Sequence, residues 1–227
     1  MTAFVAGATG LTGRAVVAAL RQRGVETRAH VRPDSSRLAD WQARFGALGA
    51  EVDATPWTLA AMTATFRAHP PTLVFGLLGT TRKRMQAEEA SYETVDYGLT
   101  VLLADAAVAA GARPRFVYLS SQGVKDGQTA GYLGARARVE AHLRQSGLPW
   151  TFARPSFILG DRDEARPGER VGASVADGLL AVARVFGGRK LAERYGSNDN
   201  ETLAQGLVRV GLDPSFEGRI AEGADLR

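Results

Sequence analysis

Short apolar runs alternate with longer amphipathic stretches from the start of the chain to about residue 160. The apolar runs predict strands over Ala3–Ala6, Glu26–Val31, Glu51–Asp53, Thr72–Leu78, Arg115–Ser120 and Trp150–Ala153. The amphipathic stretches predict helices over Leu11–Arg23, Ser36–Leu48, Leu59–His69, Glu88–Ala110 and Ala130–Ser146. Strand–helix alternation at this spacing indicates an α/β protein with a parallel sheet covered by helices on both faces. Because crossover connections are right-handed, the simplest topology is a doubly wound sheet.

The pattern changes after residue 160. Gly160–Arg170 is dense in charge, Pro and Gly, which is typical of a solvated surface loop. Ser174–Phe186 and Glu201–Val210 have helical patterns, and we expect them to form a small cap at the carboxyl edge of the sheet. The sequence therefore predicts a doubly wound sheet domain over residues 1–160. Residues 161–227 would be a small C-terminal cap on a possible substrate, within the same compact unit.

Composition excludes several function classes. The 227 residues include no cysteine and only three scattered histidines, so neither a thiol nucleophile nor a Cys- or His-rich metal site is expected. The net charge is +4, but the cations are spread among acids, and we expect no nucleic-acid partner. No run approaches 18 apolar residues, so no membrane association is predicted. The first residues lack the features of a signal peptide, and we expect a cytoplasmic protein.

A glycine-rich turn follows the first strand and opens the first helix. It reads Gly7-Ala-Thr-Gly10-Leu-Thr-Gly13-Arg. Gly7 allows a sharp turn, Gly10 lets the backbone approach a diphosphate, and Gly13 lets the helix pack tightly on the strand. The helix N-terminus then faces the anion with free N–H groups. The residues expected to hold the cofactor here are Gly7, Thr9, Gly10, Leu11, Thr12, Gly13 and Arg14. The alternative is a tight turn without a ligand.

Further motifs occur in the order known from one protein family. They are LLGTTR from Leu77, YLSSQG from Tyr118, YLGAR from Tyr132 and RPSFILG from Arg154. With the G-x-x-G-x-x-G spacing, they resemble the extended and atypical short-chain dehydrogenases/reductases, in the NmrA-like and Tat-interacting oxidoreductase-like branch. The resemblance covers about residues 1–160 and implies a Rossmann fold that binds NAD(P).

The end of the second strand bears on the choice between NAD and NADP. An acid there would accept hydrogen bonds from a ribose 2′-hydroxyl, whereas this chain has Arg32. Arg37 follows one loop later, and a guanidinium pairs well with a 2′-phosphate. Arg14 could add a third positive group. These residues favour NADP(H) as the cofactor, while Asp34 keeps NAD(H) open.

The resemblance implies further cofactor contacts. Asp53 would hold the adenine amino group, although its turn could equally cap a helix. The backbone of Leu78, Gly79 and Thr80 would pass beneath the adenosine ribose. Ser120 and Pro155 would lie beside the nicotinamide half of the cofactor. The alternatives are that these residues only end strands and shape turns.

The resemblance also implies a catalytic set. Ser121 would hold the substrate oxygen and Tyr132 would exchange a proton with it. The family has a lysine four residues after the tyrosine, but this chain has Arg136. The two positions share a helix face, so Arg136 keeps a positive charge near the phenol. It cannot relay a proton, because a guanidinium does not deprotonate in proteins.

Two main functions remain open at this point. One is an NAD(P)-dependent oxidoreductase acting on a small carbonyl or alcohol substrate, with NADPH favoured. The other is a non-catalytic NADP(H)-binding regulatory or sensor protein, and an NAD-dependent epimerase or dehydratase is a weaker alternative. The apolar faces of the helices from Glu88 and Ala130 fit a homodimer interface or the interior of a monomer equally well.

Overall fold

Seven parallel strands form one sheet in the computed structural model, which describes residues 1–80, 91–155, 158–159 and 198–227. Their order is β3-β2-β1-β4-β5-β6-β9. The strands are β1 (Thr2–Ala6), β2 (Glu26–His30), β3 (Glu51–Asp53), β4 (Leu73–Gly76), β5 (Arg115–Leu119), β6 (Trp150–Arg154) and β9 (Arg219–Glu222). A separate parallel pair joins β7 (Ile158–Leu159) to β8 (Asn198–Asp199). The predicted doubly wound α/β fold is confirmed.

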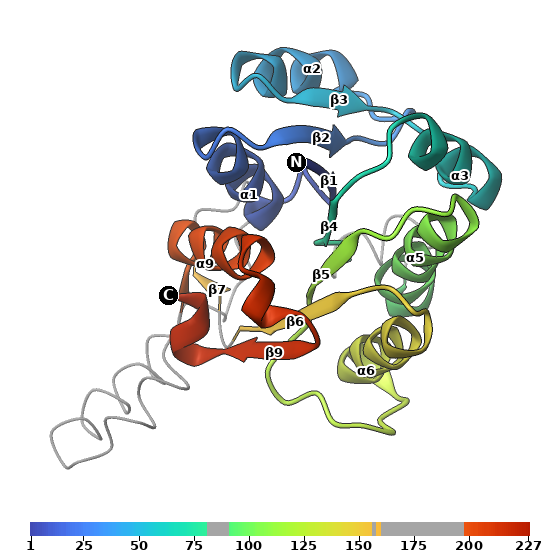
Figure 1. Cartoon of the computed structure of the whole chain (residues 1–227), viewed down its shortest axis with the longest axis vertical. Coiled ribbons are helices and arrows are strands. Elements are labelled where there is room, and N and C mark those ends of the chain that lie inside the picture. Colours follow the sequence, from blue (N-terminus) through green and yellow to red (C-terminus); the bar gives the residue numbers. More distant parts are fainter. Residues whose placement is uncertain (81–90, 156–157, 160–197) are drawn as a thin grey trace, which may run out of the picture.

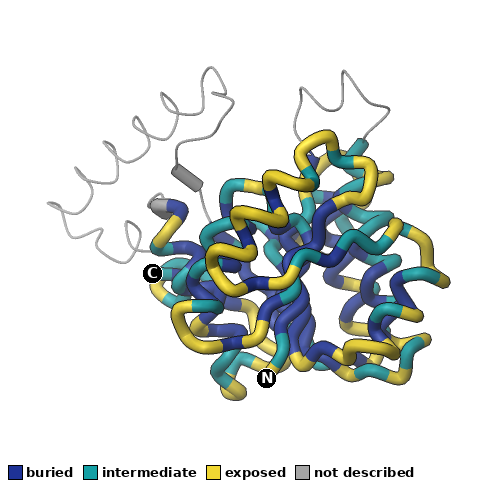
Figure 2. The backbone as a smooth tube through the Cα atoms, turned by 90° about the horizontal axis from the view of Figure 1, so that it is seen from above, coloured by how far each residue is buried: buried dark blue, intermediate teal, exposed yellow. Residues whose placement is uncertain are grey.

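Helices cover both faces of the sheet (Figure 1). One face carries α1 (Leu11–Gln22), α2 (Leu38–Ala47) and α9 (Asn200–Leu212). The other carries α3 (Leu59–Ala68), α5 (Thr100–Ala109) and α6 (Gly131–Gln145). Each face has its own apolar core, and Figure 2 shows the buried segments running through the middle of the molecule. The alternation of apolar and polar positions is therefore satisfied on two sides of one sheet.

The C-terminal segment differs from the prediction. The helix over Glu201–Val210 was expected in a cap, but α9 packs beside α1 on a face of the sheet. The chain then enters β9, which pairs in parallel with β6 and adds a seventh strand. Gly211 allows the close fit, because a Cβ there would lie 2.8 Å from the Phe75 ring. The cap assignment is wrong for this helix because its apolar side is needed to cover the sheet. Two other predicted segments, Gly160–Arg170 and Ser174–Phe186, lie outside the described residues.

The region predicted as one helix over Glu88–Ala110 contains a π-helix followed by an α-helix. Ser91 is extended and caps the helix, with its Oγ accepting the Thr94 N–H at 3.0 Å. The helix begins at Tyr92, and its first part, Tyr92–Leu99 (η1), is a π-helix that runs into α5. Glu88, where the sequence predicts the start, lies outside the described residues. π-helical turns are rare and are frequent at functional sites. Asp96, in the middle of η1, is fully buried.

Candidate cofactor and active site

The glycine-rich turn has the shape that the sequence predicts. Gly7 has a φ of +82°, and a Cβ there would lie 2.6 Å from the Leu77 carbonyl oxygen. A Cβ on Gly13 would overlap the Gly7 carbonyl and lie 2.8 Å from the Ala8 Cα. Both positions therefore need glycine for backbone reasons alone, since the first requires a left-handed conformation and the second a close approach.

The start of α1 fits a diphosphate. Gly10 is its exposed N-cap, no side chain caps the helix, and no acid lies in its first turn. Among the described residues, a Cβ on Gly10 would meet only the Gly7 carbonyl oxygen, at 3.3 Å. The helix therefore presents open backbone N–H groups and the positive end of its dipole. Thr9, Leu11 and Arg14 are half-buried around this turn, and Thr12 is buried.

Two predicted arginines follow β2 on the adenosine side of the turn. Arg32 lies 3.8 Å from Asp34, and the side chains are 43% and 72% exposed. Arg37 lies 3.6 Å from Asp40, with its guanidinium 5.0 Å from the centre of the Trp41 ring. Exposed pairs of this kind contribute little stability, so the guanidinium groups can exchange these carboxylates for a phosphate at small cost.

Asp53 ends β3 and makes a local turn. Its Oδ1 accepts the Thr55 N–H at 3.0 Å, and the carboxylate lies 3.9 Å from Arg28. The suggestion that Asp53 caps the next helix is wrong, because Thr58 caps α3 by accepting the Ala61 N–H at 3.2 Å. His30 lies beside Asp53 and packs against Trp57 in the loop after β3. Burial lowers the pKa of the His30 ring. The adenine contact of Asp53 stays a prediction.

The segment after β4 is fixed by two buried charges. The Leu78 carbonyl accepts from Arg136 Nη2 at 3.1 Å, and the Thr80 N–H donates to Asp96 Oδ2 at 2.9 Å. Gly79 lies between them, where a Cβ would be 3.1 Å from Arg136 Nη2. The Thr80 hydroxyl is buried and has no hydrogen-bond partner within the described part of the chain. Such an orphaned group is consistent with a bound polar molecule here.

Arg136 forms hydrogen bonds at the carboxyl edge of the sheet. Its Nη1 donates to the Tyr118 hydroxyl at 3.0 Å and to the Leu119 carbonyl at 2.9 Å. Its Nη2 pairs with Asp96 at 2.9 Å, and these side chains are only 6% and 0% exposed. The cation thus joins α6 to the ends of β4 and β5 and to η1. The sequence motifs give Asp96 no role, although its carboxylate is buried against Arg136.

Burial and charge act against each other in this pair. Burial raises the pKa of Asp96, although Arg136 and the Thr80 N–H favour the carboxylate. Burial alone would lower the pKa of Arg136, but Tyr118, Tyr132 and Asp96 outweigh it and leave the pKa above its ordinary value. The guanidinium is therefore charged at every working pH, and it provides a permanent positive charge at this edge.

Tyr132 lies in the first turn of α6 beside this charge. Its ring centre is 5.1 Å from the Arg136 guanidinium carbon, and it packs edge-on against Tyr92 at 5.5 Å. The predicted meeting of positions 132 and 136 on one helix face is confirmed. The side chain is 37% exposed, so its hydroxyl can meet solvent or a small molecule.

The two serines after β5 have different surroundings. Ser120 is buried and donates to Glu140 at 2.6 Å, and Glu140 is held by Arg154 at 2.6 and 2.9 Å. Ser121 is half-buried and donates to the neighbouring carbonyl of Gln122 at 3.3 Å. Pro155 is buried at the end of β6, and its carbonyl accepts the Gln122 N–H at 3.0 Å. The cofactor contact of Ser120 stays a prediction, and its hydroxyl already has a structural partner.

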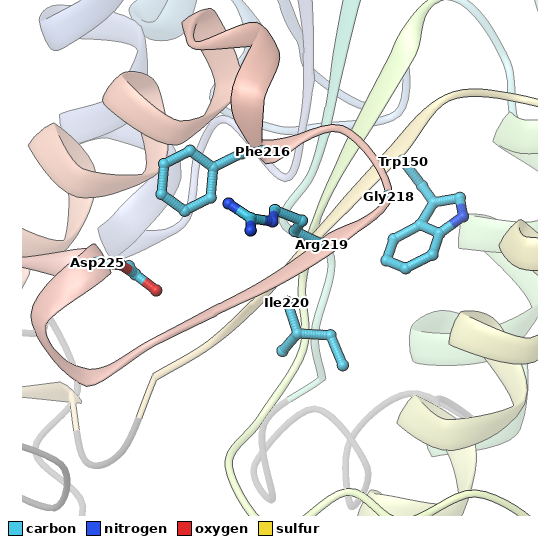
Figure 3. Close-up of a pocket in the computed structure, with 6 residues that line it drawn as sticks. All are labelled: Trp150, Phe216, Gly218, Arg219, Ile220 and Asp225. Atoms are coloured by element: carbon cyan, nitrogen blue, oxygen red, sulfur yellow. The ribbon is translucent and has the colours of Figure 1, made fainter.

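A pocket of about 520 Å³ lies elsewhere, at the edge strand β9 (Figure 3). Its walls are Trp150, Phe216, Gly218, Arg219, Ile220 and Asp225. Three strands of the sheet separate β9 from β1 and the glycine turn, so this pocket is not the candidate site.

Among the helices that the structure describes, none could span a membrane. The described part of the chain holds no group of three or more His, Asp or Glu side chains that could bind a metal ion.

Curated relatives span nearly the whole chain. It is 27% identical over 226 residues to "Protein fmp52, mitochondrial" of Aspergillus clavatus, covering 96% of this chain and 90% of the relative. It is 25% identical to "Protein FMP52, mitochondrial" of Candida albicans, covering 97% and 86%. Both relatives are named as mitochondrial proteins, so the cytoplasmic location expected from the sequence is contradicted. That expectation rested only on the lack of a secretory signal, which does not distinguish cytoplasmic from mitochondrial proteins.

Solved structures share the fold at low sequence identity. The oxidoreductase ylbE from Lactococcus lactis has a TM-score of 0.64 at 14% identity, covering 97% of this chain and 89% of that one. The UDP-N-acetylglucosamine 4-epimerase from Bacillus cereus has a TM-score of 0.60 at 15% identity, covering 93% and 73%. The NAD(P)H-binding family matches residues 7–183, a range that starts at the first glycine of the turn. With the open diphosphate cradle, this match shows that the chain belongs to the family of NAD(P)H-binding Rossmann proteins.

Proposed function

We propose that this protein is an NADPH-dependent oxidoreductase that reduces a small carbonyl compound. The observation that carries the proposal is the Arg136 guanidinium, fixed 5.1 Å from the partly exposed ring of Tyr132. A positive charge fixed beside a phenol favours transfer of the phenol proton to a substrate oxygen, because the charge stabilises the phenolate that forms. The buried ion pair with Asp96 holds this charge in place.

The chain's own residues supply positioning and a proton. A reduced nicotinamide held at the glycine turn would supply the hydride for the carbonyl carbon. The Tyr132 hydroxyl donates its proton to the carbonyl oxygen, and Ser121 holds that oxygen by a hydrogen bond. Arg136 stabilises the phenolate that forms but does not release its own proton. Solvent therefore returns the proton to Tyr132, whose side chain is 37% exposed.

A second function is favoured by a specific observation. Both terminal nitrogens of Arg136 already donate to protein acceptors on β4, β5 and η1. Among the Arg136 nitrogens, only Nε has no hydrogen-bond partner within the described residues. The guanidinium therefore has fewer free donors for a cofactor ribose than a lysine, which contacts the ribose in the family, would have. The second candidate is therefore an NADP(H)-binding regulatory protein that catalyses no reaction.

Turnover distinguishes the two functions. Purified protein is mixed with NADPH and a panel of aldehydes, ketones and quinones, and the loss of absorbance at the reduced nicotinamide band is followed. We expect oxidation of NADPH with at least one class of carbonyl. A silent panel, together with activity that appears in Arg136→Lys, would contradict the oxidoreductase and support the regulatory protein.

The cofactor preference rests on Arg32. Replacing it by aspartate (R32D) puts a negative charge where the 2′-phosphate would bind. We expect the ratio of NADPH to NADH affinity to fall about tenfold or more, since a charge-assisted pair becomes a repulsion. Arg23→Asp makes the same charge change at the far end of α1 and should leave the ratio unchanged. Equal ratios for R32D and wild type in calorimetric titrations would remove the basis for NADPH.

A further inference from the structure

Asn200 links the C-terminal helix to the glycine turn. It is the first residue of α9 and is only 8% exposed. Its Nδ2 donates to the carbonyl oxygen of Leu11 at 3.3 Å. Its Oδ1 is buried and has no hydrogen-bond partner among the described residues. A buried acceptor without a hydrogen bond is unfavourable, so this oxygen needs a donor.

The orientation of this amide is fixed by chemistry. The Leu11 carbonyl can only accept a hydrogen bond, so the amide nitrogen must face it. The oxygen is then the atom left over, and it needs an O–H or N–H partner. A phosphate cannot serve, because it carries no proton to donate in its fully ionised form. The missing partner is therefore a group that carries an O–H or N–H, and the ribose hydroxyls and the carboxamide of a dinucleotide carry such groups.

The position of α9 indicates which half of a dinucleotide would supply that partner. Leu11 is the first residue of α1, directly after the diphosphate cradle. On the sheet face that it shares with α1, α9 lies over β5 and β6, whereas Arg32 follows β2 on the other side of β1 (Figure 1). Asn200 thus approaches the cradle from the side of Ser121, which follows β5. The half bound on this side carries the nicotinamide.

We propose that Asn200 is a cofactor-binding residue whose Oδ1 accepts a hydrogen bond from the nicotinamide-riboside half of NADP(H). The donor is either the carboxamide N–H or a ribose hydroxyl. The proposal rests on dinucleotide binding at the glycine turn, and it does not depend on turnover. It gives the C-terminal segment a role in binding, and it explains why a buried amide has one satisfied end and one unsatisfied end.

The test compares three probes on wild type, Asn200→Leu and the matched control Gln205→Leu, which removes an exposed amide from the same helix. The probes are NADP⁺, its 3-acetylpyridine analogue, which has no carboxamide N–H, and 2′,5′-ADP, which lacks the nicotinamide riboside. We expect Asn200→Leu to weaken NADP⁺ binding about tenfold, the size of one lost hydrogen bond, and to leave 2′,5′-ADP unchanged. Gln205→Leu should change neither.

The analogue separates the two donors. If the carboxamide is the donor, wild type binds the acetylpyridine analogue more weakly than NADP⁺, and Asn200→Leu removes the difference. If a ribose hydroxyl is the donor, Asn200→Leu weakens both dinucleotides by the same factor. Unchanged NADP⁺ affinity, or an equal loss for 2′,5′-ADP, would overturn the proposal. Should the leucine variant fail to fold, Asn200→Ala is measured in the same way. A wild type that binds NADP⁺ but oxidises no NADPH contradicts the oxidoreductase alone.

Discussion

Replacing Tyr132 by phenylalanine is expected to lower kcat for NADPH oxidation by about 10²–10⁴, the usual contribution of a positioned proton donor. The change removes one oxygen atom and keeps the ring, so the contacts with Arg136 and Tyr92 persist. NADPH affinity should stay close to that of wild type, because the hydroxyl acts on the substrate oxygen. Steady-state kinetics on the best carbonyl of the panel, with a separate NADPH titration, measure both quantities.

Tyr92→Phe is the matched control for this variant. It removes a hydroxyl from the ring that packs edge-on against Tyr132, at 5.5 Å between ring centres. We expect its kcat to remain near that of wild type, because this phenol has no assigned proton to transfer. A Tyr132→Phe enzyme with more than half of the wild-type rate would show that the proton comes from another group, and the proposed mechanism would be abandoned.

Loss of the Arg136 cation should have the largest effect on stability. Arg136→Met keeps most of the side-chain volume but leaves Asp96 buried without its partner, at 0% exposure. It also leaves the Leu78 and Leu119 carbonyls without their donor. Breaking a buried ion pair from one side costs about 3–5 kcal/mol, so we expect the free energy of unfolding to fall by about that amount. Urea unfolding followed by circular dichroism measures it.

The pH dependence identifies the cause of this loss. The pKa of Asp96 is raised by burial, and without the cation it should rise further. An acid whose pKa is higher in the folded state stabilises the fold at low pH and loses that contribution as the pH rises through its folded pKa. The Arg136→Met protein should therefore gain stability relative to wild type as the pH is lowered from neutral toward the ordinary pKa of an aspartate. A loss that does not depend on pH would point to poor packing instead.

Arg138→Met is the control on the same helix. Arg138 pairs with Glu93 and lies over the Tyr97 ring, but its side chain is 34% exposed. Exposed pairs contribute little, so this variant should unfold much like wild type. If it lost as much stability as Arg136→Met, the effect could not be assigned to the buried pair.

The glycine turn and the pairing of Tyr132 with Arg136 could be predicted from residues close together in sequence. The glycine turn follows from steric rules alone, since Gly7 must have positive φ and Gly13 must admit a carbonyl oxygen. The meeting of Tyr132 and Arg136 follows from helix geometry, which places residues four apart on one face. The doubly wound topology of the parallel sheet follows from strand–helix alternation and crossover handedness. Each of these predictions needed only residues close together in sequence.

The remaining features depend on residues far apart in sequence. Asp96 looked like a solvated helix residue, because an acid in an amphipathic stretch usually faces water and the pattern assumes α-helical turns. The π-helical turns of η1 place it inside, 40 positions before its partner Arg136. Likewise, nothing near Ser120 shows that its hydroxyl is bound by Glu140. The signal available for Asp96 was a charge of opposite sign on the neighbouring helix.

The seventh strand was missed for a similar reason. Arg219–Glu222 is four residues long and carries a charge at both ends, so its pattern resembles a surface turn. Its pairing with β6 supplies the stability that the sequence of the strand does not show. Short strands of low apolar content are identified by their neighbours in the sheet rather than by their own residues.

The position of α9 against α1 has a consequence for synthesis on the ribosome. Translation makes α1 first, but α9 covers it only after the strands between them have been made. The edge of β6 at Thr151 likewise stays open until Arg219 of β9 has been added. Until then, the emerging chain carries a bare apolar helix face and an open strand edge, both of which promote aggregation. We expect a chain that stops before β8 to aggregate more readily than one that includes α9 and β9.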